Sequence, residues 1–127
     1  MPFHKSFLLL ALLSISLSCL GQLRGKVVSI ADGDTFTLLT DDHRQIKIRL
    51  HGIDCPEKAQ PFGTRAKQFT SNLIFGYRVE VEVTDTDRYG RTIGIIHLGT
   101  GKILNELLLQ SGLAWHYSAT IKIKTGL

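Results

Sequence analysis

The hexapeptide Gln45-Ile-Lys-Ile-Arg-Leu50 alternates strictly between polar and apolar side chains. A period of two is typical of a β-strand that buries one of its faces. The apolar face carries Ile46, Ile48 and Leu50. We therefore expect a half-buried strand here, and the rest of the fold follows from its neighbours.

Two strands are predicted before this one. Residues 23–30 and Thr35–Thr40 are rich in β-branched side chains. The polar stretches Ala31–Asp34 and Asp41–His43 separate them and predict turns. The three strands together predict an antiparallel meander.

Downstream, apolar residues at helical spacing predict an amphipathic helix over Gly63–Phe75. Strands are predicted over Tyr77–Asp85, where apolar residues alternate with charged ones, and over Thr92–Leu98. A short helix is predicted over Ile103–Gln110, and it ends before Gly112. Five strands, with one helix between the third and fourth and another after the fifth, predict an α+β, mainly β, OB-fold barrel.

Composition limits the class of protein. The 127 residues suffice for one domain, and 43% hydrophobic with 20% charged residues excludes a disordered chain. The formal net charge of +4 is compatible with a polyanionic partner.

The N-terminus is typical of a secretory signal peptide. Lys5 precedes an apolar run, Phe7–Leu17, that is short for a bilayer span, and small residues follow. We expect a leader over residues 1–21, a domain over residues 22–127, and a secreted or periplasmic protein. An uncleaved anchor is the alternative, and lipid attachment at Cys19 is less favoured because no leucine stands three residues before it.

Four acidic side chains are candidates for a metal site. Asp32 and Asp34 flank Gly33, while Asp54 and Glu57 follow the strand that carries Arg49. A meander can place these segments side by side, and clustered carboxylates need a cation or an arginine among them. Oxygen ligands without a Cys–His pair favour Ca²⁺ or Mg²⁺ over zinc. Asp-Gly-Asp by itself is also typical of a solvated turn.

Other side chains suit a phosphate substrate. Arg49 and Arg91 can grip phosphate oxygens in a bidentate manner, although a lone arginine on a strand is usually a surface residue. Glu57 has the residue type of a general base, and Tyr89 and Tyr117 can stack on or hydrogen-bond a nucleotide. We expect Asp41, Asp42, Asp85 and Asp87 to be solvated loop acids.

Three segments in order resemble the thermonuclease family, whose domain is staphylococcal-nuclease-like. They are Asp32-Gly-Asp-Thr35, Arg49-Leu-His-Gly-Ile-Asp-Cys-Pro-Glu57 and Asp87-Arg-Tyr-Gly-Arg91. Gly101-Lys-Ile-Leu-Asn-Glu106 and Gly112-Leu-Ala114 follow in the family's order.

The resemblance implies a role for each matching residue. Asp34 and Asp54 would be calcium carboxylates, with the backbone carbonyl of Cys55 as a third ligand and Asp32 near the metal. Glu57 would be the general base, Arg49 and Arg91 would hold the phosphate, and Tyr89 would contact the nucleotide. The implied reaction is Ca²⁺-dependent hydrolysis of DNA and RNA that leaves 3′-phosphate ends. We expect a monomer that prefers single strands and, once the leader is removed, binds no membrane.

The C-terminus departs from the family. Thermonucleases usually continue into a long polar helix, whereas Ser118–Leu127 alternates Ile and Lys, so we expect that helix to be missing. Two alternatives to an active nuclease therefore stay open: a non-catalytic OB-type nucleic-acid-binding module and a truncated inactive nuclease.

Overall fold

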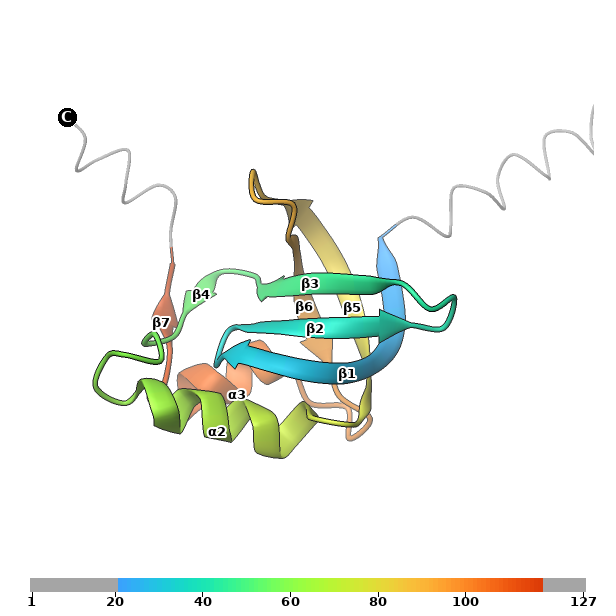
Figure 1. The fold of residues 1–127 in the computed structure, drawn as a ribbon. Coiled ribbons are helices and arrows are strands. Elements are labelled where there is room, and N and C mark those ends of the chain that lie inside the picture. The colour runs from blue at the N-terminus through green and yellow to red at the C-terminus, as the bar shows by residue number, and fades with distance from the viewer. Residues whose placement is uncertain (1–20, 118–127) are drawn as a thin grey trace, which may run out of the picture.

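Five strands close into a barrel in the order β1-β2-β3-β6-β5 in the computed structural model of the protein, which describes residues 21–117 (Figure 1). Their bounds are β1 Gln22–Asp32, β2 Thr35–Thr40, β3 Gln45–Leu50, β5 Arg78–Thr86 and β6 Thr92–His97. Helices α2 (Gly63–Ile74) and α3 (Leu104–Gln110) lie together below the barrel in Figure 1. The predicted fold class is confirmed.

The predicted meander is present, because β1 pairs with β2 and β2 with β3, each time antiparallel. β2 and β3 have the predicted bounds, and Ile48 and Leu50 are buried. The prediction for Ala31–Asp34 was wrong in its first half, since β1 continues through Asp32, which pairs with Thr35. Register shifts along β1 accommodate the extra residues and curve the strand, as barrel closure requires.

A parallel pair closes the barrel. β3 runs alongside β6, with Arg49 opposite Ile93 and Leu50 opposite Gly94. Because the two strands run in the same direction, the residues just before β6 lie near the Arg49 end of β3. This arrangement brings the sequence around Arg91 to the segment that follows Arg49.

The helices seal one opening of the barrel. α2 buries Ala66, Thr70 and Ile74, and Leu104 and Leu108 of α3 are fully buried. Gly112 has a φ of +75°, the left-handed conformation that ends α3 at the predicted place. The core consists of apolar side chains from all five barrel strands and both helices, including Val27, Phe36, Leu38, Ile48, Val81 and Ile96.

A two-stranded sheet was not predicted. β4 (Ile53–Asp54) and β7 (Trp115–His116) pair antiparallel, so that Asp54 lies opposite Trp115. Segments of two residues are too short to show alternation in a sequence. This sheet fixes the backbone around Asp54.

Two predictions fall outside the described residues: the leader over residues 1–21, of which only Gly21 is described, and the missing helix in the C-terminal stretch after Tyr117. Within residues 21–117, neither helix has the length and apolar character needed to cross a bilayer.

Candidate active site

Arg49 lies at the centre of a cluster of charged side chains. Its Nη1 is 3.3 Å from Oδ2 of Asp34, and its Nη2 contacts Oδ1 of Asp54. Nη1 also donates to the carbonyls of Ile53, at 2.9 Å, and Leu50, at 3.2 Å. The Arg49 side chain is only 15% exposed. Backbone and carboxylate oxygens together therefore fix the orientation of its guanidinium.

Asp34 is a buried carboxylate with several donors. Its Oδ2 accepts a hydrogen bond from the backbone N–H of Cys55 at 2.8 Å, and its Oδ1 accepts one from the Thr35 hydroxyl at 3.1 Å. These bonds, together with the charge of Arg49, compensate for the removal of the carboxylate from water. They also tie the β1–β2 turn to the segment after β4.

Strand register explains why these residues meet. Thr35 pairs with Arg49 across β2 and β3, and the backbone N–H of Leu50 donates to the carbonyl of Asp34 at 2.9 Å. The predicted proximity of the first turn and the end of the third strand is therefore present.

Asp32 holds the loop after Glu57. Its Oδ1 accepts a hydrogen bond from the backbone N–H of Lys58 at 3.2 Å. The neighbouring Gly33 packs so closely on α2 that a Cβ there would lie 2.9 Å from that of Ala66. Thr70 of α2 donates to the Gly33 carbonyl at 2.6 Å. The turn, the loop and α2 thus form one connected unit.

Glu57 lies on an exposed turn within that unit. Its backbone N–H donates to Oε1 of Gln60 at 2.7 Å, and the Gln60 N–H donates to the Glu57 carbonyl at 2.8 Å. In the described part of the chain, the Glu57 carboxylate makes no hydrogen bond or ion pair. It is therefore an accessible acceptor, set apart from the carboxylates that contact Arg49.

Arg91 is oriented by an acid that was predicted to be solvated. Its Nε is 2.7 Å from Oδ2 of Asp87, whose Oδ1 accepts the N–H groups of Tyr89 and Arg91, each at 2.9 Å. Partial burial raises the pKa of Asp87, but the hydrogen bonds from Arg91 and Tyr89 outweigh it and lower the pKa. The prediction of a solvated acid was therefore wrong for Asp87, which positions Arg91.

One cavity of about 580 Å³ joins most of the predicted residues. Its lining includes Arg49, Asp54, Tyr89, Arg91 and Tyr117. Tyr89 is 70% exposed, and the guanidinium of Arg91 lies 5.6 Å from the centroid of its ring. Asp34 and Glu57 are not among the lining residues. Of the predicted residues, the cavity therefore gathers both arginines, both tyrosines and Asp54, and Asp87 joins them.

The donor set around Arg49 suits a hard cation. The side chains of Asp34 and Asp54 and the carbonyl of Cys55 supply only oxygen, which is the ligand type that Ca²⁺ prefers. Among residues 21–117 no group of three His, Cys, Asp or Glu side chains is arranged to hold a metal. A calcium ion here would therefore take its other ligands from water and the substrate.

The thiol of Cys55 plays no part in this donor set. Burial, reinforced by the negative charge of Asp34, raises its pKa to about 12. The residue is 6% exposed, so its side chain belongs to the core.

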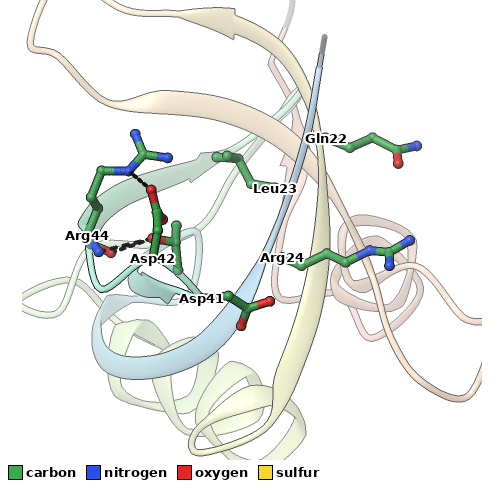
Figure 2. A pocket seen from close by; sticks show the side chains of 7 residues that line it. Gln22, Leu23, Arg24, Asp41, Asp42 and Arg44 are labelled. Atoms are coloured by element: carbon green, nitrogen blue, oxygen red, sulfur yellow. Dashed lines mark hydrogen bonds and ion pairs between the residues drawn. The ribbon is translucent and has the colours of Figure 1, made fainter. Parts of the chain in front are cut away.

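Figure 2 shows a different cavity, of about 470 Å³, where the start of β1 lies beside the end of β2. Its charges are already paired: Arg44 contacts Asp42 at 2.7 Å, and Asp41 contacts Arg78 at 2.6 Å. Hydrogen bonds from Arg78 lower the pKa of Asp41, and those from Thr40 and Arg44 lower the pKa of Asp42. Both acids are exposed, as predicted, and each of them pairs with an arginine.

Two other residues that the sequence reasoning missed support the site. Thr35 binds Asp34, and the buried amide of Asn105 donates to the carbonyls of His51 and Gly94, at 3.1 and 3.3 Å. Asn105 thereby fastens α3 to the end of β3. The tight Asp87-Arg-Tyr-Gly-Arg91 turn is the one signal that could have revealed Asp87, because Asp commonly accepts backbone N–H groups within turns.

Comparison with known proteins agrees with this geometry. The family model described as staphylococcal nuclease homologue matches residues 47–126. The chain is 38% identical over 113 residues to a micrococcal nuclease from Shigella flexneri, covering 83% of this chain and 64% of that protein. It is 39% identical over 116 residues to Protein ParB from Escherichia coli, covering 85% and 65%.

An uncharacterized endonuclease from Haemophilus influenzae is 41% identical over 92 residues, covering 72% of this chain and 51% of that protein. The chain thus spans about half to two thirds of these three relatives. The family model alone matches more than half of the chain. The chain therefore belongs to the family of staphylococcal nuclease homologues.

Proposed function

We propose that this chain is an exported calcium-dependent nuclease that hydrolyses phosphodiester bonds of DNA and RNA. The observation that carries the proposal is the shared cavity, in which Arg49 and Arg91 lie with Asp54 and Tyr89. Relatives named as a micrococcal nuclease and as an endonuclease support the same reaction class.

The two arginines bind the phosphate in this proposal. Arg91 contacts a carboxylate of the described residues through its Nε alone. Both of its Nη groups therefore remain to donate to phosphate oxygens. Arg49 is held more rigidly, by two carbonyls and two acids. Two positive charges offset the repulsion between the phosphodiester and an anionic nucleophile, and they stabilise charge that builds on the phosphate oxygens.

Asp34, Asp54 and the Cys55 carbonyl would hold calcium. When bound, the ion adds positive charge beside the phosphate and so stabilises the transition state. The hydrogen bonds to Asp34 from Thr35 and Cys55 keep its carboxylate oriented toward this position.

Glu57 acts as the general base. Its carboxylate is exposed and makes no ion pair among residues 21–117, so it is accessible to a water molecule. The backbone on either side of Glu57 is held by the hydrogen bond from the Lys58 N–H to Asp32 and by the turn that the Gln60 N–H closes on the Glu57 carbonyl. A base positioned in this way contributes about 10²–10⁴-fold to a rate.

The proposal includes little sequence specificity, because the arginines contact phosphates rather than base edges. Single strands should be preferred, since an unpaired chain can bring a phosphate close to the cavity and its bases onto Tyr89 and Tyr117. A monomer and a leader over residues 1–21 complete the proposal. The full acid and arginine set favours an enzyme over the two alternatives, a binding module and an inactive fragment.

Replacement of Glu57 by Gln tests the proposal. We expect the protein to cut denatured DNA in calcium, and Glu57→Gln to slow cutting by at least about 10²-fold without loss of DNA binding. Glu106→Gln, at an exposed acid on α3, is the matched control and should cut normally. If Glu57→Gln cuts at the rate of the unaltered protein, the assignment of the base is wrong; if the unaltered protein binds but never cuts, the chain is a binding module.

A further inference from the structure

Phe62 combines two unusual features. Its side chain is 62% exposed, and its backbone has a φ of 64°, in the left-handed region that bulky residues rarely adopt. Such strained residues persist only where the surroundings hold them, and they cluster at ligand sites. Neither feature helps the core, so the position of the ring needs another explanation.

The chain around Phe62 folds back onto the proposed base. The N–H of Gly63 donates to the carbonyl of Gln60 at 3.0 Å, and a Cβ at Gly63 would overlap the carbonyl oxygen of Glu57. Gly63 therefore packs directly on the backbone of Glu57. The Cα of Phe62 is one step, about 3.8 Å, from that of Gly63, so the backbone of Phe62 lies close to the backbone of Glu57 despite the intervening residues.

Phe62 also has a cationic partner. The guanidinium of Arg65 lies 5.8 Å from the centroid of its ring. Tyr89 is built in the same way, with Arg88 at 5.1 Å and Arg91 at 5.6 Å from its ring centroid. An exposed aromatic ring beside a guanidinium is the arrangement on which single-stranded nucleic acids stack, because the ring takes the base and the cation attracts the backbone.

Phe62 and Tyr89 belong to two different segments, one directly before α2 and one between β5 and β6. In Figure 1 the green loop before α2 and the orange tip between β5 and β6 lie on opposite sides of β4, which carries Asp54. Phe62 ends the first of these segments, and Tyr89 lies in the second. Each of these two segments therefore carries an exposed aromatic ring next to an arginine.

We propose that Phe62, supported by Arg65, stacks on a nucleobase of the single-stranded substrate on the Glu57 side of the phosphate that is cut. This inference rests on the proposed function and extends it: it assigns a further base-binding position besides Tyr89 and Tyr117.

Binding measurements with full-length protein carrying Glu57→Gln test the inference without cleavage. With a fluorescently labelled oligothymidylate in calcium, Phe62→Ala should weaken binding about tenfold, within the range known for loss of one stacked base. Phe62→Trp should restore it. Phe75→Ala is the matched control, because Phe75 is a 53% exposed phenylalanine at the other end of α2. Equal affinities for Phe62→Ala and Phe75→Ala would overturn the inference.

An abasic scan tests the same contact from the side of the substrate, first with the Phe62 ring in place and then in Phe62→Ala. Oligothymidylates with one abasic position at successive places should show a place on each side of the cut where binding falls. At the Glu57 side, Phe62→Ala should make that loss disappear. A loss that persists unchanged in Phe62→Ala overturns the inference while leaving the nuclease proposal intact. A protein that neither binds nor cuts any oligonucleotide ends both.

Discussion

Replacement of Arg49 by methionine should destabilise the protein as well as abolish its nuclease activity. The change keeps an unbranched apolar stem and removes the guanidinium group with its charge. Asp34, 7% exposed, then loses its cation, and the carbonyls of Leu50 and Ile53 lose their side-chain donor. Removal of one partner from a buried ion pair costs about 3–5 kcal/mol, because the remaining charge stays uncompensated.

Arg91→Met is the matched comparison. The Arg91 side chain is 30% exposed and pairs with a single acid, whereas Arg49 is 15% exposed and contacts two. The Arg91–Asp87 pair is only partly buried, so Arg91→Met should lower the free energy of unfolding by about 1 kcal/mol, less than Arg49→Met. Both variants should lose nuclease activity.

Urea unfolding followed by the fluorescence of Trp115, the chain's one tryptophan, measures both free energies of unfolding. Trp115 lies opposite Asp54 in the β4–β7 sheet, so it reports on the structure next to Arg49. We expect a lower midpoint for Arg49→Met with an unchanged slope. A destabilisation below about 1 kcal/mol would refute the view that Arg49 is required to compensate Asp34.

Three further predictions concern the surroundings of the site. The pKa of Asp87 is lowered in the folded state. Ionised Asp87 therefore contributes its full stabilisation above the unfolded pKa, and this contribution is lost as the pH falls through the folded pKa. The difference in the free energy of unfolding between the unaltered protein and Asp87→Asn should accordingly shrink in unfolding curves recorded in acid. Cys55 should react slowly with iodoacetamide in the folded protein and rapidly in urea, and Cys55→Ala should keep its activity at a cost of about 1 kcal/mol in thermal melts. Gly63→Ala should reduce cleavage much more than DNA binding, because its Cβ would push the Glu57 carbonyl away.

The strands were predictable where one face is buried. The alternation of Ile46, Ile48 and Leu50 identified β3, and the meander correctly placed Asp34 beside Arg49. The predicted residues Arg49, Arg91, Tyr89 and Tyr117 all line the same cavity. The strand predictions were confirmed because strand period and antiparallel pairing are local properties.

Contacts that depend on closure of the barrel were out of reach. The parallel pairing of β3 with β6 brings Arg91 near Arg49, yet nothing in either strand specifies its partner. The β4–β7 pair was missed for the same reason, because its strands have two residues each. Asp87 was misassigned, since its three hydrogen bonds depend on a turn geometry that composition does not reveal.

Single-turnover cleavage of a short single-stranded oligonucleotide, with calcium and then with excess chelator, tests most directly whether the acid–arginine cluster is a nuclease centre. The account predicts cutting in calcium by the unaltered protein, none in chelator, and a loss of at least about 10²-fold in Asp54→Asn. Equal cutting with calcium and with chelator, or full activity of Asp54→Asn, would contradict it.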